Sequence, residues 1–223
     1  MTQSNITFAR GLYGITPQWD DKNQLLNAIE KACQGGMRIL QWRQKSLSAA
    51  DALPIALVAK DICHQYDCQF FVNDSVQLAL DCRADGVHIG RDDGTVADIR
   101  SACQAQAQDL LIGVSCYNDI ELAKQFIDQG VAYVAFGALF SSEVKPDAVA
   151  APLSLFAEAK AYMQKLNLSD DTRPALVGIG GIDQHNAASV VEAGADSIAV
   201  ITGLFESDDI QNTAQSLSNL FQI

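Results

Sequence analysis

The sequence predicts a (β/α)8 TIM barrel that forms a single α/β domain over residues 1–223. Short apolar segments recur eight times at broadly regular intervals, and segments with helical periodicity lie between them. The apolar segments lack a polar face, which is typical of parallel strands that are covered on both sides. No linker or low-complexity stretch interrupts the series, and the length is usual for one such barrel.

The eight expected strands follow one another from residue 11 to residue 203. They are GLYGIT (11–16), RILQWRQK (38–45), QFFVND (69–74), GVHIG (86–90), LLIGVS (110–115), YVAFGAL (133–139), ALVGIG (175–180) and SIAVITG (197–203). Between strands, segments 119–130 and 183–194 show helical periodicity and end in glycine, as a helix C-cap often does. An open doubly wound sheet is the alternative to a closed barrel.

The composition restricts the partners of the chain. A net charge of −12 argues against nucleic acid or an anionic membrane surface, because both require a basic face. Anionic small molecules remain compatible if the few cations converge locally. No apolar run has the length of a membrane span, and MTQSNITFAR lacks the apolar core of a signal peptide, so we expect a cytoplasmic protein. A homo-oligomer stays open, since the outer helices of a barrel can pack against a second copy.

Six cysteines are expected to be reduced thiols, because they form no CxxC pair and a chain of this length needs no disulfides. Cys63, His64 and Cys68 could suggest a metal clip, but no second ligand pair follows at the spacing of a zinc site. We expect these cysteines to be small residues on a buried helix face.

Polar residues gather at the expected carboxyl ends of the strands, where a barrel builds its active site. Gln41, Arg43 and Lys45 alternate, so an extended chain would point all three to the same side. Further polar or glycine positions follow the other strands, namely Asn73, Asp74, His88, Arg91, Asp92, Asp93, Ser115, Ser142, Lys145, Gly180, Gly181, Thr202 and Gly203. Among these, His88 is expected to orient the loop after the fourth strand.

Converging cations at this mouth would favour a phosphorylated ligand. Arg43 and Lys45 share one face of the second expected strand, Arg91 follows the fourth strand and Lys145 the sixth, in an otherwise acidic chain. Arginine offers a planar fork to phosphate and lysine a point charge. A salt-bridged strand end is the alternative for Arg43 and Lys45.

Two carboxylates lie at the ends of neighbouring expected strands. Asp74 closes the third strand and Asp93 follows the fourth. Carboxylates near a phosphate favour Mg²⁺, which is usually held by one or two of them together with phosphate oxygens and water. General acid–base catalysis is an alternative role, and N-capping of the next helix is another for Asp92 and Asp93.

Glycines follow the seventh and eighth strands, in GIGGI (178–182) and ITGLF (201–205). Glycine lets backbone N–H groups approach an anion, and barrels frequently build a phosphate site from these two loops.

The ordered motifs resemble the thiamine-phosphate synthase family, barrel enzymes that join the pyrimidine and thiazole halves of thiamin. The resemblance runs from GLYGIT to AVITGLF. It rests on QWRQK, FFVNDSVQLAL, ADGVHIGRDD, IGVS and VGIGGI followed by EAGADSIAVIT.

The resemblance implies a role for each matched residue. Gln41, Arg43, Lys45 and Asn73 would hold 4-amino-2-methyl-5-hydroxymethylpyrimidine diphosphate, and Asp74 and Asp93 would hold Mg²⁺. Ser115 and Lys145 would face the same substrate and, with Arg43, act in catalysis. The phosphate of the thiazole substrate would lie at Ser142, Val144, Gly181, Ile201 and Thr202.

The implied reaction breaks the bond between the pyrimidine methylene and oxygen. Pyrophosphate leaves, and the thiazole nitrogen attacks the resulting cation, so the protein supplies charge stabilisation and no nucleophile.

The sequence departs from the family pattern at two positions. The family commonly reads T-x-T-K where this chain has SEVK, so that Val144 lacks a hydroxyl, and Arg91 replaces a common glutamine. Val144 is expected to weaken phosphate binding, whereas Arg91 either adds a cation or pairs with Asp92 or Asp93.

Three alternatives keep the barrel but change the function. The related thiazole tautomerase has a histidine where this chain has Tyr117. A barrel that only binds a phosphorylated ligand would tolerate Val144. A sugar-phosphate isomerase or epimerase would need an acid–base pair, for which His88 is the histidine nearest the mouth.

Overall fold

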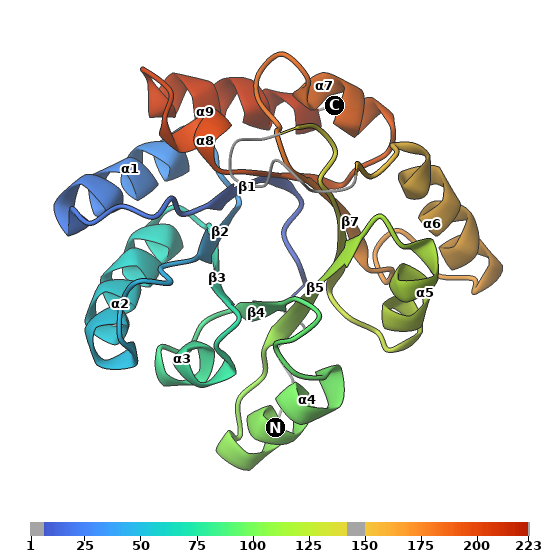
Figure 1. Cartoon of the computed structure of the whole chain (residues 1–223), viewed down its shortest axis with the longest axis horizontal. Coiled ribbons are helices and arrows are strands. Elements are labelled where there is room, and N and C mark those ends of the chain that lie inside the picture. The colour runs from blue at the N-terminus through green and yellow to red at the C-terminus, as the bar shows by residue number, and fades with distance from the viewer. Residues whose placement is uncertain (1–6, 142–149, 223) are drawn as a thin grey trace.

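A computed structural model describes residues 7–141 and 150–222, and its eight strands close into a parallel barrel in the order β1 to β8. The strands are Gly11–Ile15 (β1), Ile39–Trp42 (β2), Gln69–Asn73 (β3), Gly86–Ile89 (β4), Leu111–Tyr117 (β5), Tyr133–Phe136 (β6), Ala175–Ile179 (β7) and Ser197–Val200 (β8). Figure 1 looks along the barrel. The (β/α)8 prediction is confirmed, and the open doubly wound alternative is wrong because β1 pairs with β8.

Helices surround the barrel as an outer ring (Figure 1). They are Lys22–Gln34 (α1), Ala49–Gln65 (α2), Val76–Asp81 (α3), Val96–Gln106 (α4), Ile120–Asp128 (α5), Ser154–Lys165 (α6), Ala187–Glu192 (α7), Thr202–Phe205 (α8) and Ile210–Ser218 (α9), followed by a 3-10 turn at Asn219–Phe221. Side chains of Asp21, Ser48, Ser75, Thr95, Asp119 and Asp209 cap helix N-termini. No described helix is long and apolar enough to cross a membrane.

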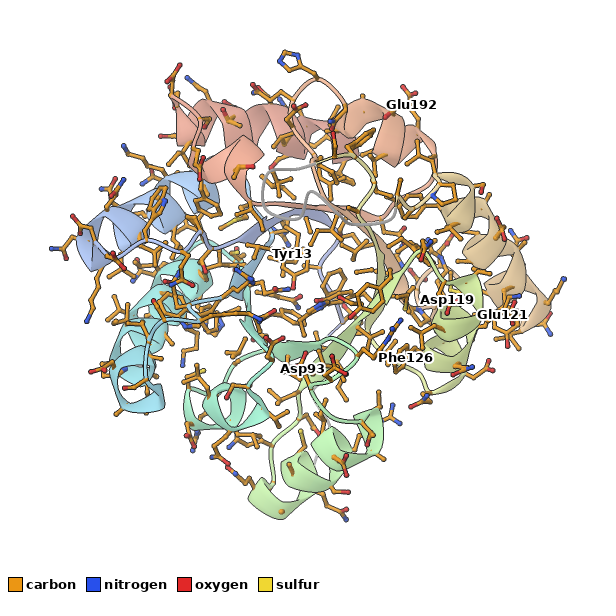
Figure 2. The ribbon with its side chains drawn as sticks, viewed as in Figure 1. Tyr13, Asp93, Asp119, Glu121, Phe126 and Glu192 are labelled. Carbon is orange, nitrogen blue, oxygen red and sulfur yellow. The ribbon has the colours of Figure 1, made fainter. Side chains whose placement is uncertain are left out.

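Two apolar layers hold the fold together. The larger lies between the strands and the helices, and the smaller fills the barrel with inward-facing side chains such as Tyr13, Phe71 and Tyr133. Figure 2 shows Tyr13 inside the barrel, whereas Glu121 and Glu192 project outward from the helices.

Glycines make room for the interior rings. A Cβ atom on Gly113 would lie 2.0 Å from the Tyr133 ring, and one on Gly86 would lie 2.2 Å from the Phe71 ring. Both glycines are therefore required by close approach, because any larger residue would displace an aromatic side chain from the barrel.

The second strand is shorter than the sequence predicted, since it ends at Trp42 and not at residue 45. Beyond Trp42, side chains replace the ladder of backbone hydrogen bonds. The Arg43 N–H donates to Thr16 Oγ1 (2.7 Å), and the Lys45 N–H donates to Gln18 Oε1 (2.9 Å). Pro17 in the neighbouring segment has no N–H to continue the pairing. Arg43 and Lys45 thus belong to the loop, and of these three residues only Gln41 points inward from the strand.

All six cysteines are free and buried, as expected. The Sγ atoms of Cys33, Cys63 and Cys68 lie within 4.8 Å of one another, whereas His64 is paired with Asp85 instead. Cys68 reaches Cys63 because its N–H donates to the Cys63 carbonyl at the end of α2, which is the bond that closes many helix C-termini.

An ion pair closes the amino-terminal end of the barrel. Asp196 accepts two hydrogen bonds from the Arg173 guanidinium (2.6 and 2.8 Å) and a third from the Leu176 N–H (2.8 Å). The side chains of Arg173 and Asp196 are only 6% and 10% exposed. The pair ties the loop before β7 to the start of β8.

Asp196→Ala should lower the free energy of unfolding by about 3–5 kcal/mol, because the Arg173 guanidinium loses its buried carboxylate and the Leu176 N–H loses its acceptor. Urea denaturation measures this loss. Asp170→Ala is the matched control. It removes the other carboxylate bound to Arg173, and the side chain of Asp170 is 83% exposed. The control should leave the urea midpoint nearly unchanged, and equal losses in the two variants would contradict the assignment.

Candidate active site

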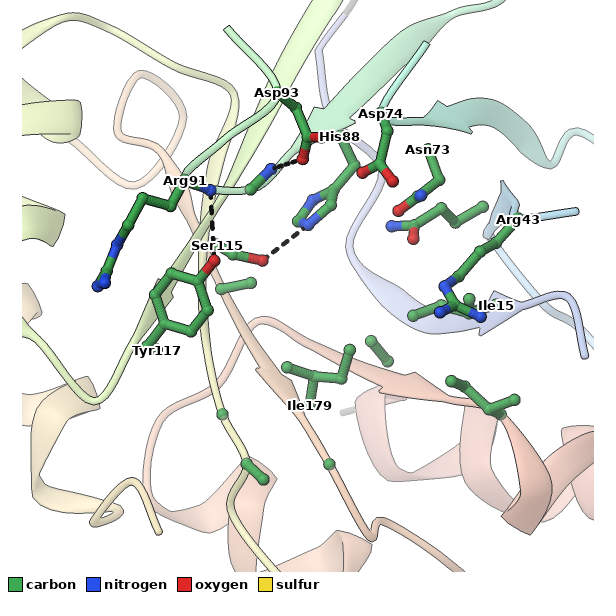
Figure 3. Close-up of a pocket in the computed structure, with 18 of the residues that line it drawn as sticks. Ile15, Arg43, Asn73, Asp74, His88, Arg91, Asp93, Ser115, Tyr117 and Ile179 are labelled. Carbon is green, nitrogen blue, oxygen red and sulfur yellow. Dashed lines mark hydrogen bonds between the residues drawn. The ribbon is translucent and has the colours of Figure 1, made fainter. Parts of the chain in front are cut away.

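A cavity of about 390 Å³ opens at the carboxyl ends of the strands. Ten of the predicted site residues line it, namely Gln41, Arg43, Lys45, Asn73, Asp74, Asp93, Ser115, Gly181, Ile201 and Thr202. Figure 3 shows several of them facing one space. Ser142, Val144 and Lys145 lie outside the described residues, so their predicted roles stay predictions.

The two sides of the cavity differ in chemistry. Loops after β2, β3 and β4 supply Arg43, Lys45 and Arg91 together with the carboxylates of Asp74 and Asp93. The side formed by β7 and β8 supplies Gly181 and Thr202. Apolar side chains, including Ile15, Ile179 and Ala199, line the rest of the cavity. The cavity can therefore hold an apolar ring between two polar ends.

Asp74 is placed by its backbone and by Lys45. Its φ of +63° is in the left-handed region, and its N–H donates to the His88 carbonyl (2.8 Å) across β3 and β4. The Lys45 ammonium lies 2.9 Å from Asp74 Oδ2. Ser75, and not Asp74, caps α3. The alternative of a salt-bridged strand end therefore applies to Lys45, while the Asp74 carboxylate still lines the cavity.

Asp93 is held by the turn after β4. One of its oxygens accepts the Gly90 N–H at 2.8 Å. The helix cap that could have explained this acid is instead Thr95, which forms a capping box with Asp98 at the start of α4. The capping alternative for Asp92 and Asp93 is therefore wrong.

The donor set of Asp74 and Asp93 fits a hard divalent cation. Both carboxylates line the cavity from adjacent strand ends (Figure 3), and each keeps an oxygen outside the hydrogen bond or ion pair described above. Oxygen ligands of this kind suit Mg²⁺ when a phosphate supplies further oxygens.

Arg91 stacks on Tyr117 instead of pairing with an acid. Its guanidinium carbon lies 5.0 Å from the centre of the Tyr117 ring. The backbone N–H of Arg91 donates to Tyr117 Oη (3.3 Å). Among the described residues, no ion pair joins Arg91 to Asp92 or Asp93. The register of β5 shifts between Ser115 and Tyr117, and Tyr117 has φ +55°, so both side chains face the cavity.

His88 differs from its predicted role. It was expected to orient a loop, but it points into the barrel, where Nδ1 lies 2.7 Å from Tyr133 Oη and Nε2 lies 2.9 Å from Ser115 Oγ. Its neighbour across the strand pair is Asn73, and both side chains line the cavity. Tyr13 and Tyr133 below it were missed, because a tyrosine within an apolar strand has the pattern of an ordinary core residue.

The loop after β7 needs glycine, because its backbone has positive φ angles and passes close to neighbouring backbone atoms. Gly180 and Gly181 have φ +100° and +64°, and a Cβ atom on Gly181 would lie 2.6 Å from the Ser141 carbonyl oxygen. Asn186 Nδ2 donates to the Gly181 carbonyl (2.9 Å), which fixes the loop. Gly181 and Thr202 thus line one side of the cavity, as predicted.

Comparison with known proteins decides the family. The model of the family described as "Thiamine monophosphate synthase" matches residues 12–204. The chain belongs to this thiamine monophosphate synthase family. Thiamine-phosphate synthase of Bordetella avium is 48% identical over 220 residues, which covers 99% of each chain. The synthase of Chromobacterium violaceum is 46% identical and covers 95% of this chain and 96% of the relative.

Solved structures agree with this membership. A thiamine phosphate pyrophosphorylase from Pyrococcus furiosus superposes with a TM-score of 0.79 at 27% identity, covering 95% of both chains. A 3-hexulose-6-phosphate synthase superposes with a TM-score of 0.66 at 17% identity, over 93% of this chain and 98% of that one, which shows the shared fold alone. As a member of the thiamine monophosphate synthase family, the chain is a transferase of thiamine biosynthesis, and the non-enzymatic alternative is set aside.

Inorganic pyrophosphate should bind this cavity, and Arg43→Met should weaken binding by about 10- to 100-fold, the effect of losing a hydrogen bond to a charged group. Titration calorimetry measures the affinity. Arg83→Met is the matched control, because Arg83 is exposed and precedes β4 at the opposite end of the barrel. Similar losses in both variants would indicate a general charge effect and contradict a local anion site.

Proposed function

We propose that this enzyme condenses 4-amino-2-methyl-5-hydroxymethylpyrimidine diphosphate with 4-methyl-5-(2-phosphoethyl)thiazole to give thiamine monophosphate and pyrophosphate. The observation that carries the proposal is the two-sided cavity. Cations and carboxylates from β2 to β4 suit a diphosphate with its metal, and the glycine loop after β7 suits a single phosphate. The apolar floor between them suits two aromatic rings in contact.

The residues around the diphosphate would act through charge. The bond between the pyrimidine methylene and the bridging oxygen breaks, and both electrons leave with pyrophosphate. Arg43 lines this side of the cavity and would stabilise the growing negative charge. Lys145 is proposed for the same role from its matched position in the family motif.

Asp74 and Asp93 would hold Mg²⁺. The ion, when bound, neutralises charge on the leaving group as a Lewis acid. Lys45 lies 2.9 Å from Asp74, so it would orient that carboxylate while remaining within reach of a phosphate oxygen.

The thiazole side would position the nucleophile. Gly181, Ile201 and Thr202 would bind the phosphate, with Ser142 and Val144 contributing by their place in the motif. The thiazole nitrogen then forms the new bond to the pyrimidine methylene. No protein nucleophile is needed, and no cysteine is among the described residues that line the cavity.

The proposal is tested by mixing the purified protein with both substrates and following thiamine monophosphate and pyrophosphate by chromatography. One equivalent of each product should form with Mg²⁺, and very little after treatment with a chelator. Omission of the thiazole phosphate should abolish the coupled product. Failure to form it under all these conditions would overturn the proposed substrates.

Asp93→Ala should lower kcat/KM by about 1000-fold, equivalent to roughly 4 kcal/mol, because it removes a ligand of the proposed metal. Steady-state kinetics over a range of Mg²⁺ concentrations measure the effect. Asp109→Ala is the matched control, since this exposed carboxylate precedes β5 at the far end of the barrel. Near-normal turnover of Asp93→Ala would exclude the metal role.

A further inference from the structure

A continuous chain of side-chain hydrogen bonds crosses the barrel beneath the cavity. Gln41 Nε2 lies 3.0 Å from Tyr13 Oη, which lies 2.8 Å from Tyr133 Oη. Tyr133 Oη is 2.7 Å from His88 Nδ1, and His88 Nε2 is 2.9 Å from Ser115 Oγ. The five residues come from β1, β2, β4, β5 and β6, and the rings of His88 and Tyr133 are stacked with 13° between their planes.

Gln41, His88 and Ser115 reach the cavity, but the two tyrosines of this chain do not. Gln41 and Ser115 line the cavity, whereas Tyr13 and Tyr133 are only 1% and 0% exposed and are not among the lining residues. The two tyrosines therefore act on a ligand only through their neighbours.

Each hydroxyl has a single hydrogen, so the direction of one bond sets the next. Tyr13 accepts from the Gln41 amide, so its own hydrogen is available for Tyr133 Oη, which lies 2.8 Å away. Tyr133 then donates to His88 Nδ1. Burial raises the pKa of both tyrosines, which keeps the two phenols protonated.

The direction of the hydrogen bonds continues through His88 to Ser115. A neutral imidazole that accepts at Nδ1 has its hydrogen on Nε2, which lies 2.9 Å from Ser115 Oγ and would donate to it. The hydroxyl hydrogen of Ser115 is then left to donate into the cavity. At the opposite end, the Gln41 amide nitrogen is used by Tyr13, and its carbonyl oxygen is left to accept.

We propose that this chain is a proton-ordered relay that presents one acceptor, Gln41, and one donor, Ser115, to the substrate. Tyr13, Tyr133 and His88 are its positioning residues. The ligand class rests on the proposed function: an aminopyrimidine offers an amine donor and a ring-nitrogen acceptor, which are the complements of Gln41 and Ser115. An oxo analogue replaces the amine donor by a carbonyl acceptor, and the relay would have to reverse at every bond for Gln41 to donate to it.

The tautomer of His88 tests the relay without turnover. The chain has three histidines, so ¹⁵N-histidine NMR with a His88→Gln reference assigns the signal. We expect the Nε2–H tautomer in the wild type. Tyr13→Phe, which removes a hydroxyl bonded to Tyr133, should shift His88 toward a mixture of tautomers. A wild-type Nδ1–H tautomer or imidazolium, or no response to Tyr13→Phe, would overturn the relay.

Tyr66→Phe is the matched control for this measurement. It removes a phenol hydroxyl outside the barrel that bonds Glu30 and Gln34. The signal of His88 should not change in this variant. A change as large as that of Tyr13→Phe would show that the shift is not transmitted through the chain, and would also overturn the proposal.

Kinetics test the consequence for the substrate. Tyr133→Phe should raise KM for the pyrimidine diphosphate by about 10-fold or more, as expected when buried partners are left unpaired, and should leave KM for the thiazole phosphate near its wild-type value. Discrimination between the amino substrate and its oxo analogue should fall. Equal rises in both KM values would overturn the positioning role, and Tyr13→Phe provides the same readouts if Tyr133→Phe does not fold.

The two proposals fail separately. If the wild type forms no thiamine monophosphate while His88 keeps the expected tautomer and responds to Tyr13→Phe, the proposed substrates are wrong and the relay stands. If the product forms but the tautomer test gives the opposite result, the relay alone is wrong.

Discussion

Three aromatic rings inside the barrel, those of Tyr13, Phe71 and Tyr133, determine where the cavity can exist. The amino-terminal part of the interior is filled by these rings and by Phe8, whose ring centre lies 4.6 Å from that of Tyr133. The carboxyl-terminal part is left open as the cavity. Gly86 and Gly113 allow this filling because they have no side chain where the rings pass. The same tyrosines turn an otherwise apolar floor into a support for polar groups above it.

Much of the architecture could be predicted from the sequence because it follows from repeated local patterns. Each strand is a short apolar segment, and the parallel order follows from the alternation with helices. The cavity residues could also be predicted, since the carboxyl ends of parallel barrel strands must meet at one rim. Asp74 and Asp93 lie at that rim, although they are separated by nineteen positions in the printed sequence.

What the sequence could not predict depends on contacts across the barrel. The end of β2 at Trp42 depends on hydrogen bonds from a neighbouring segment, so the alternation of Gln41, Arg43 and Lys45 suggested a strand that is too long. The direction of the His88 side chain depends on Tyr133, forty-five positions away. The cysteine cluster depends on two helix ends that meet in space. Local periodicity contains none of these distances.

The ion pair between Lys45 and Asp74 at the cavity bears on the proposed phosphorylated ligand. Lys45 and Asp74 are partly exposed and face each other at 2.9 Å, and an exposed ion pair of this kind has a small net stability. An anion without a metal would compete with Asp74 for Lys45 and leave the carboxylate unpaired. A metal ion without a phosphate would compete with Lys45 for Asp74 and leave the ammonium unpaired. The proposed diphosphate, arriving with a divalent cation, would satisfy both residues at once. The pairing of opposite charges at the rim therefore supports a metal-bound diphosphate over either ion alone.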